Sequence, residues 1–102
     1  MITWVRTAKV HDGKLLPAIE WGLKVTAYVN ETFGINASMH RNVAGPLNMV
    51  QWVDTYDSLA SFEEISAKII ADPGYQGLLA EANEQGLFRG ESIEDFLYQS
   101  LP

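Results

Sequence analysis

Apolar and polar positions alternate along this chain at spacings that change from segment to segment, and each spacing predicts an element. Residues 2–10 are rich in β-branched and aromatic side chains and precede a turn-like His11-Asp12-Gly13, which predicts a strand. From Lys14 to about Thr32 the apolar residues recur at helical spacing, and Gly34 provides the expected end of that helix. The first third of the chain is therefore expected to be a strand followed by a long helix.

Residues 35–56 predict a hairpin that turns at Ala44-Gly45-Pro46, with Val43 paired to Leu47. Alternation along the two strands then sorts the side chains onto two faces. The face expected to pack against helices carries Ile35, Ala37, Met39, Arg41, Val43, Leu47, Met49, Gln51, Val53 and Thr55. The opposite face is polar and aromatic and carries Asn36, Ser38, His40, Asn42, Asn48, Val50, Trp52, Asp54 and Tyr56.

Two helices are predicted after Tyr56. Asp57 or Ser58 can cap the first one, and Ser61-x-x-Glu64 fits a capping box. A proline in a helix interior costs about 3 kcal/mol, so the first helix should not continue through residue 73. Asp72 is instead a preferred N-cap and Pro73 suits the first helical position, which predicts a second helix from Pro73 to about Gln85 that ends at Gly86.

The last segment, residues 88–99, is compatible with two structures. Ser92-x-x-Asp95 can cap a short helix, whereas the apolar residues on both sides of the segment fit a strand. With a strand there, the order is strand, helix, strand, strand, helix, helix, strand. This is the split βαβ or ferredoxin-like order of an α+β protein, and no linker divides the 102 residues into more than one domain.

The segments GINASMHRNVAGPLNMVQWVDTYDSLASFEE and ADPGYQGLLAEA resemble NIPSNAP-type members of the dimeric α+β barrel superfamily, and the resemblance covers nearly the whole chain. It implies a four-stranded antiparallel sheet with helices on one face and residues 88–99 as the last strand. It also implies a homodimer whose sheets pack into a barrel. Since the face with Trp52 and Tyr56 is predicted to lie away from the helices, dimerisation is expected to bury it.

Composition narrows the functional classes. Residues 1–53 hold five basic and three acidic side chains, whereas residues 54–102 hold two basic and ten acidic ones. This balance argues against nucleic acid or an anionic membrane as a partner. The chain has no cysteine, and Arg6 and Lys9 interrupt the first apolar segment, which is unlike a signal peptide. A soluble cytoplasmic protein without a metal or other cofactor is expected.

Six residues of the polar and aromatic face are the candidate ligand-binding residues: Asn36, Ser38, His40, Asn42, Trp52 and Tyr56. Histidine exchanges protons near neutral pH, and asparagines can fix a carbonyl or quinone oxygen. Trp52 and Trp4 can stack on a flat aromatic ligand. The alternatives are a hydrogen-bonded histidine at a polar rim and tryptophans that belong to the core or to a dimer interface. Arg6 and Arg41 fit either an acidic ligand group or surface ion pairs.

Two functional hypotheses follow from these residues and from the resemblance. The first is a NIPSNAP-like dimeric barrel of uncharacterised role that binds a small hydrophobic or aromatic ligand in its cavity. The second is a cofactor-independent monooxygenase or isomerase of the antibiotic-biosynthesis-monooxygenase type. No catalytic set of the superfamily's enzymes maps onto this sequence, so the fold by itself does not decide between binding and catalysis.

Overall fold

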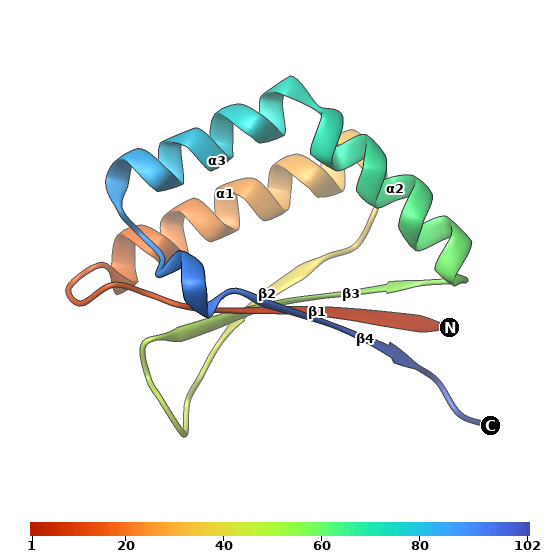
Figure 1. The fold of residues 1–102 in the computed structure, drawn as a ribbon, viewed down its shortest axis with the longest axis horizontal. Coiled ribbons are helices and arrows are strands. Elements are labelled where there is room, and N and C mark those ends of the chain that lie inside the picture. Colours follow the sequence, from red (N-terminus) through yellow and green to blue (C-terminus); the bar gives the residue numbers. More distant parts are fainter.

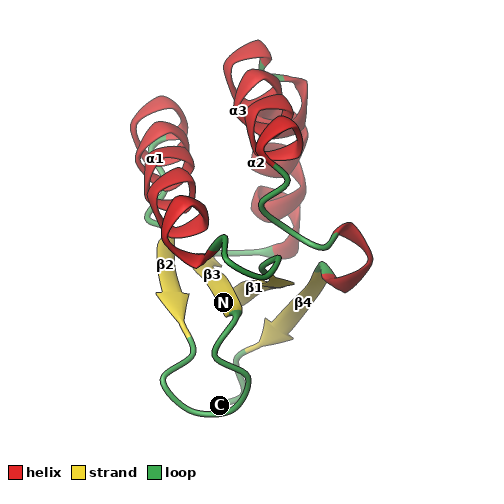
Figure 2. Cartoon of the chain, turned by 90° about the vertical axis from the view of Figure 1, so that its left-hand side faces the viewer, coloured by secondary structure: helices red, strands yellow, loops and turns green.

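Four antiparallel strands form one sheet in the spatial order β2-β3-β1-β4. The computed structural model describes residues 1–102. The elements in chain order are β1 (Ile2–Lys9), α1 (Leu15–Phe33), β2 (Ser38–Arg41), β3 (Met49–Tyr56), α2 (Leu59–Ala71), α3 (Pro73–Gln85), the 3₁₀ turn η1 (Gly90–Ser92) and β4 (Glu94–Gln99). All three helices lie on one face of the sheet (Figures 1 and 2). The α+β, ferredoxin-like fold predicted from the sequence is confirmed.

The last strand is shorter than predicted. β4 begins at Glu94, because η1 occupies the residues before it and Phe88 forms only an isolated bridge with Val10. Both ends of this segment are nevertheless held to β1, since the Arg89 amide donates to the Lys9 carbonyl at 2.9 Å. The alternative of a helix capped by Ser92 is therefore wrong.

The register of the β2–β3 hairpin differs from the prediction by one residue. The predicted register pairs Arg41 with Met49, whereas the structure pairs Arg41 with Val50 and Met39 with Trp52. Asn42 explains the shift, because its side-chain amide donates to the Pro46 carbonyl at 2.8 Å and closes the turn further along the chain. A shift of one residue moves every side chain of one strand to the other face relative to its partner.

The predicted assignment of the two faces is therefore right for β2 and wrong for β3. The residues of β3 that lie under the helices are Val50, Trp52, Asp54 and Tyr56, all of them buried. They share this face with Trp4 and Arg6 of β1, which pair with Asp54 and Trp52. Ser38 and His40 of β2 lie on the opposite face, since they pair with Val53 and Gln51. The face that no helix covers thus carries different β3 side chains from those expected.

The helix ends follow the local sequence closely. Ser58 caps α2 in a capping box with Ser61, so the predicted box between Ser61 and Glu64 is wrong although the Ser58 cap is confirmed. Pro73 is the first residue of α3, and the Asp72 carboxylate caps that helix by accepting from the Tyr75 amide at 2.9 Å. Helices α2 and α3 are therefore two helices that meet at a proline, as predicted. None of the helices combines the length and hydropathy needed to cross a membrane.

The core lies between α1, α3 and the sheet. Leu87, Val10 and Val50 are the largest side chains with almost no exposure. Helix α1 approaches the sheet closely at Gly22, where a Cβ atom would lie 2.3 Å from the Met39 side chain and 3.3 Å from the Trp52 ring. The absence of a side chain at Gly22 therefore lets α1 pack directly on the two residues that the register places opposite each other.

Candidate functional site

A cavity of about 480 Å³ separates α2 and α3 from the sheet, which is within the range of small-molecule sites. Seventeen of its 23 lining residues are hydrophobic. The sheet contributes the floor, α1 one wall, α2 and α3 the roof, and the segment from Phe88 to Asp95 the last wall. The lining residues used below are Trp4, Arg6, Trp21, Trp52, Tyr56, Phe62, Ser66, Tyr75, Phe88 and Asp95.

Aromatic rings line this cavity at two separate positions along β3. At one position Trp52 lies 6.3 Å from Trp21 and 5.8 Å from Phe88, in edge-to-face arrangements. At the other position Tyr56 lies 5.2 Å from Phe62 of α2, also edge to face. Trp52 and Tyr56 are four residues apart on β3, which corresponds to about 13 Å along the strand. The distance suits a flat ligand of two or three fused rings.

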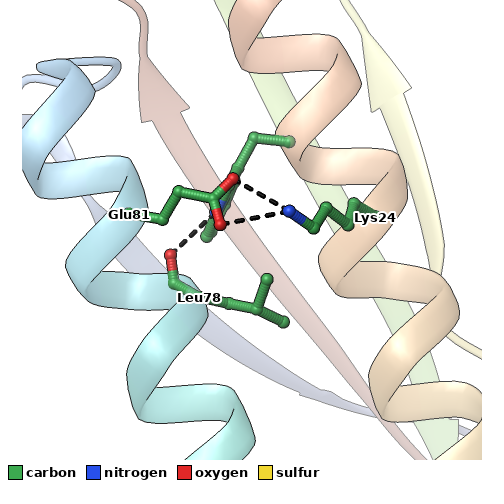
Figure 3. Close-up of polar contacts among 4 residues, drawn as sticks. Lys24, Leu78 and Glu81 are labelled. Atoms are coloured by element: carbon green, nitrogen blue, oxygen red, sulfur yellow. Dashed lines mark hydrogen bonds and ion pairs between the residues drawn. The ribbon is translucent and has the colours of Figure 1, made fainter.

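Trp21 and Trp52 differ in their hydrogen bonding. The Trp21 indole nitrogen donates to the Leu78 carbonyl of α3 at 2.8 Å, beside the ion pair in which Lys24 Nζ lies 3.0 Å from Glu81 Oε1 (Figure 3). The Trp52 indole nitrogen is buried and has no hydrogen-bond partner in the protein. An unpaired buried donor costs about 1–3 kcal/mol, so an acceptor on a bound molecule would remove a penalty there.

The charged part of the cavity is an ion pair on its floor. Arg6 of β1 donates two hydrogen bonds to Asp95 of β4, at 2.6 Å and 2.8 Å, and its guanidinium lies 5.4 Å from the centre of the Trp4 ring. The hydrogen bonds from Arg6 hold the pKa of Asp95 below its ordinary value. Since the two charges compensate each other, the floor offers no free cation to an acidic ligand.

Replacement of Asp95 by asparagine is expected to lower stability by up to about 1 kcal/mol near neutral pH, because the pair is partly exposed and screened. A depressed pKa in the folded state stabilises the protein above the unfolded-state pKa and loses this effect as the pH falls through the folded-state value. The difference between wild type and D95N should therefore shrink below about pH 4. Urea unfolding of both proteins near neutral pH and below about pH 4 measures this difference in stability. The exposed Glu63→Gln should show no such pattern.

Asp54 and Tyr56 lie next to each other on the helix-facing side of β3. One carboxylate oxygen of Asp54 accepts from the Thr55 amide at 2.8 Å, and the other is buried without a partner. Burial, together with the charge of Asp54, raises the pKa of the Tyr56 hydroxyl well above its ordinary value. Tyr56 therefore keeps its proton at neutral pH and can donate a hydrogen bond.

The structure divides the six candidate residues between separate places. Trp52 and Tyr56 line the cavity. Ser38 and His40 lie on the open face of the sheet, where the Ser38 hydroxyl is 2.8 Å from His40 Nε2. Asn42 holds the hairpin turn through Pro46, and Asn36 is exposed in the segment between α1 and β2. The prediction that all six share one face is therefore wrong, because it relied on the displaced register.

Several cavity residues were not singled out from the sequence. Asp95, Tyr75, Phe62 and Phe88 come from segments more than fifty residues away from the first strand. No spacing in the sequence connects them to Trp52, because tertiary packing alone brings them together. The abundance of tryptophan was the one indication, and Trp4, Trp21 and Trp52 all line the cavity.

Comparison with solved structures identifies the fold. An uncharacterised NIPSNAP domain protein from Burkholderia xenovorans matches with a TM-score of 0.83 and 17% identity, over 99% of this chain and 95% of that chain. A NIPSNAP family protein from Agrobacterium tumefaciens matches with a TM-score of 0.76 and 21% identity, over 98% and 92%. The chain has the fold of NIPSNAP proteins. The resemblance stated from the sequence is thus confirmed at the level of the fold.

The same fold occurs in an enzyme. SnoaB from Streptomyces nogalater, a cofactor-independent oxygenase, matches with a TM-score of 0.70 and 16% identity, over 97% of this chain and 91% of that chain. No protein-family model and no curated protein sequence matches the chain. The NIPSNAP-like fold therefore carries both proteins of unknown function and an oxygenase, and the side chains of the cavity must decide between them.

Proposed function

We propose that this NIPSNAP-like protein binds a small, uncharged aromatic compound with a carbonyl oxygen in the cavity between the helices and the sheet. The buried Trp52 indole N–H supports this proposal most directly, because Trp52 lines the cavity and its donor has no acceptor in the protein. Aromatic rings at two separate positions in the cavity favour a flat ligand. The compensated charges of Arg6 and Asp95 favour a neutral one.

The test uses 2-tetralone, a bicyclic aromatic ketone, and tetralin, which has the same rings without the carbonyl. Trp52→Phe keeps an aromatic ring in place and removes the N–H. We expect this change to weaken 2-tetralone binding about threefold to tenfold, as for the loss of one hydrogen bond. Tetralin should bind both proteins with similar affinity. Equilibrium dialysis measures both ligands without relying on tryptophan fluorescence.

Equal losses for 2-tetralone and tetralin in W52F would show that Trp52 contributes packing alone, and failure of both compounds to bind the wild type would refute the ligand class. Oxygen consumption on addition of 2-tetralone would favour the second function, a cofactor-independent oxygenase.

We further propose that the protein works as a homodimer, as the family resemblance implies, and that it is located in the cytoplasm. The face of the sheet opposite the helices supports the dimer, because Phe96 and Tyr98 stack there with ring centres 6.3 Å apart and remain exposed. Exposed aromatic pairs of this kind are typical of protein interfaces.

A further inference from the structure

The open face of the sheet is organised in rows that run across all four strands. One row is apolar in its middle and consists of Ser38, Val53, Val5 and Phe96 on β2, β3, β1 and β4. The adjacent row is polar and consists of His40, Gln51, Thr7 and Glu94 on the same strands. A polar row with a histidine at one edge of the sheet thus ends in a carboxylate at the other edge.

His40 has no acidic partner within its own protomer. The ion pairs of the chain are Arg6–Asp95, Lys24–Glu81, Lys68–Glu64 and Arg89–Asp12. The groups around His40 are the Ser38 hydroxyl, the Gln51 side chain opposite it and the cationic Arg41. At the β2 edge, Ile19 and Leu23 of α1 and Met39 of β2 line a small hollow with His40. Glu94 is exposed and unpaired, and Thr7 lies opposite it. The His40 imidazole at one end of the row and the Glu94 carboxylate at the other are therefore available to another molecule.

We infer that two copies pack these faces together about a two-fold axis parallel to the strands, so that His40 contacts the partner's Glu94. This inference rests on the proposed homodimer. An axis between β3 and β1 reverses the order of the strands in the partner, so β2 lies over the partner's β4. Val53 then lies over the partner's Val5 in the centre of the interface. At each end of the polar row, His40 of one protomer lies over the partner's Glu94.

A two-fold axis in the plane of the interface but perpendicular to the strands gives a poorer match. It places β2 over the partner's β2 and β4 over the partner's β4. If it passes through the apolar row, Glu94 lies over the partner's Tyr98, and if it passes through the polar row, two Glu94 carboxylates lie over each other. Like charges in contact oppose association. Charge complementarity therefore selects the axis parallel to the strands.

The arrangement makes association dependent on pH. Histidine gains its positive charge as the pH falls from 8 to 6, while glutamate keeps its negative charge in that range. A dimer with two symmetric pairs should therefore be tighter at about pH 6 than at about pH 8, with a dissociation constant lower by about three- to thirtyfold. The net charge of −6 also weakens association at high pH, so control variants are needed to isolate the pair.

Sedimentation equilibrium of the full chain at the two pH values tests the inference. His40→Gln and Glu94→Gln should each reduce the pH dependence to the residual effect of net charge, and His40→Lys should keep the dimer tight at both pH values. His11→Gln and Glu91→Gln make the same changes of residue type at exposed positions outside the open face and should behave as wild type. Circular dichroism confirms that each variant is folded.

Two outcomes would overturn the inference in different ways. A monomer at every pH would remove the second copy from the open face, while the binding of 2-tetralone would still test the cavity separately. A dimer whose pH dependence is the same in H40Q, H11Q and wild type would keep the homodimer and refute the contact between His40 and Glu94.

Discussion

Replacement of Leu87 by alanine is expected to lower the free energy of unfolding by about 3 kcal/mol, the largest stability loss we predict for a single change in this protein. Leu87 is 1% exposed, and it directly follows Gly86, which ends α3. Its backbone is held on both sides, since its amide donates to the Ala82 carbonyl and its carbonyl accepts from His11. The surroundings therefore cannot collapse easily into the space that the side chain leaves.

Urea unfolding followed by circular dichroism measures this loss. Leu101→Ala removes the same atoms from a side chain that is 86% exposed and should leave the unfolding midpoint unchanged. Because domains of this size have about 5–15 kcal/mol of stability, L87A should remain folded in water at room temperature. A midpoint equal to that of L101A would show that Leu87 is not part of a closely packed core.

Replacement of Ser66 by tryptophan is expected to weaken 2-tetralone binding by more than about thirtyfold, equivalent to roughly 2 kcal/mol. Ser66 lies on α2 and faces the cavity. A bicyclic side chain at this position takes the space that a bicyclic ligand needs. The fold should tolerate the change, because α2 contains no fully buried residue and can move outward slightly.

Ala67→Trp is the matched control, since the next residue of α2 is exposed and does not line the cavity. It introduces the same side chain into the same helix and should leave 2-tetralone binding unchanged. If both S66W and A67W bind 2-tetralone as tightly as the wild type does, the ligand lies outside the cavity. Equal losses in both variants would indicate a general disturbance of α2.

Local chemistry predicted the elements and their ends well. Asp72 and Pro73 marked the junction of two helices because an N-cap and a proline at the first helical position need no tertiary partner. Gly34 and Gly86 likewise end their helices with positive φ angles of 65° and 63°. Such features depend on a few neighbouring residues, and the sequence contains all of them.

The cavity could not be predicted from the same kind of evidence. Its floor depends on which residues of β3 face the helices, and a pairing register shifted by one residue reverses that choice. The hydrogen bond from Asn42 to Pro46 is a detail of loop geometry that composition does not indicate. Trp52 was therefore recognised as a candidate ligand-binding residue but was expected on the wrong side of the sheet.

The alternation of β3 has a further consequence for how the protein can change. Trp52 and Tyr56 face the cavity, while Gln51 and Val53, the two neighbours of Trp52 in the sequence, face the open side of the sheet. A single thickness of backbone therefore separates the proposed ligand cavity from the proposed dimer surface. Substitutions at even-numbered positions of this strand are therefore expected to alter ligand choice, and substitutions at odd-numbered positions to alter self-association. The two properties can then diverge separately among proteins that share this fold.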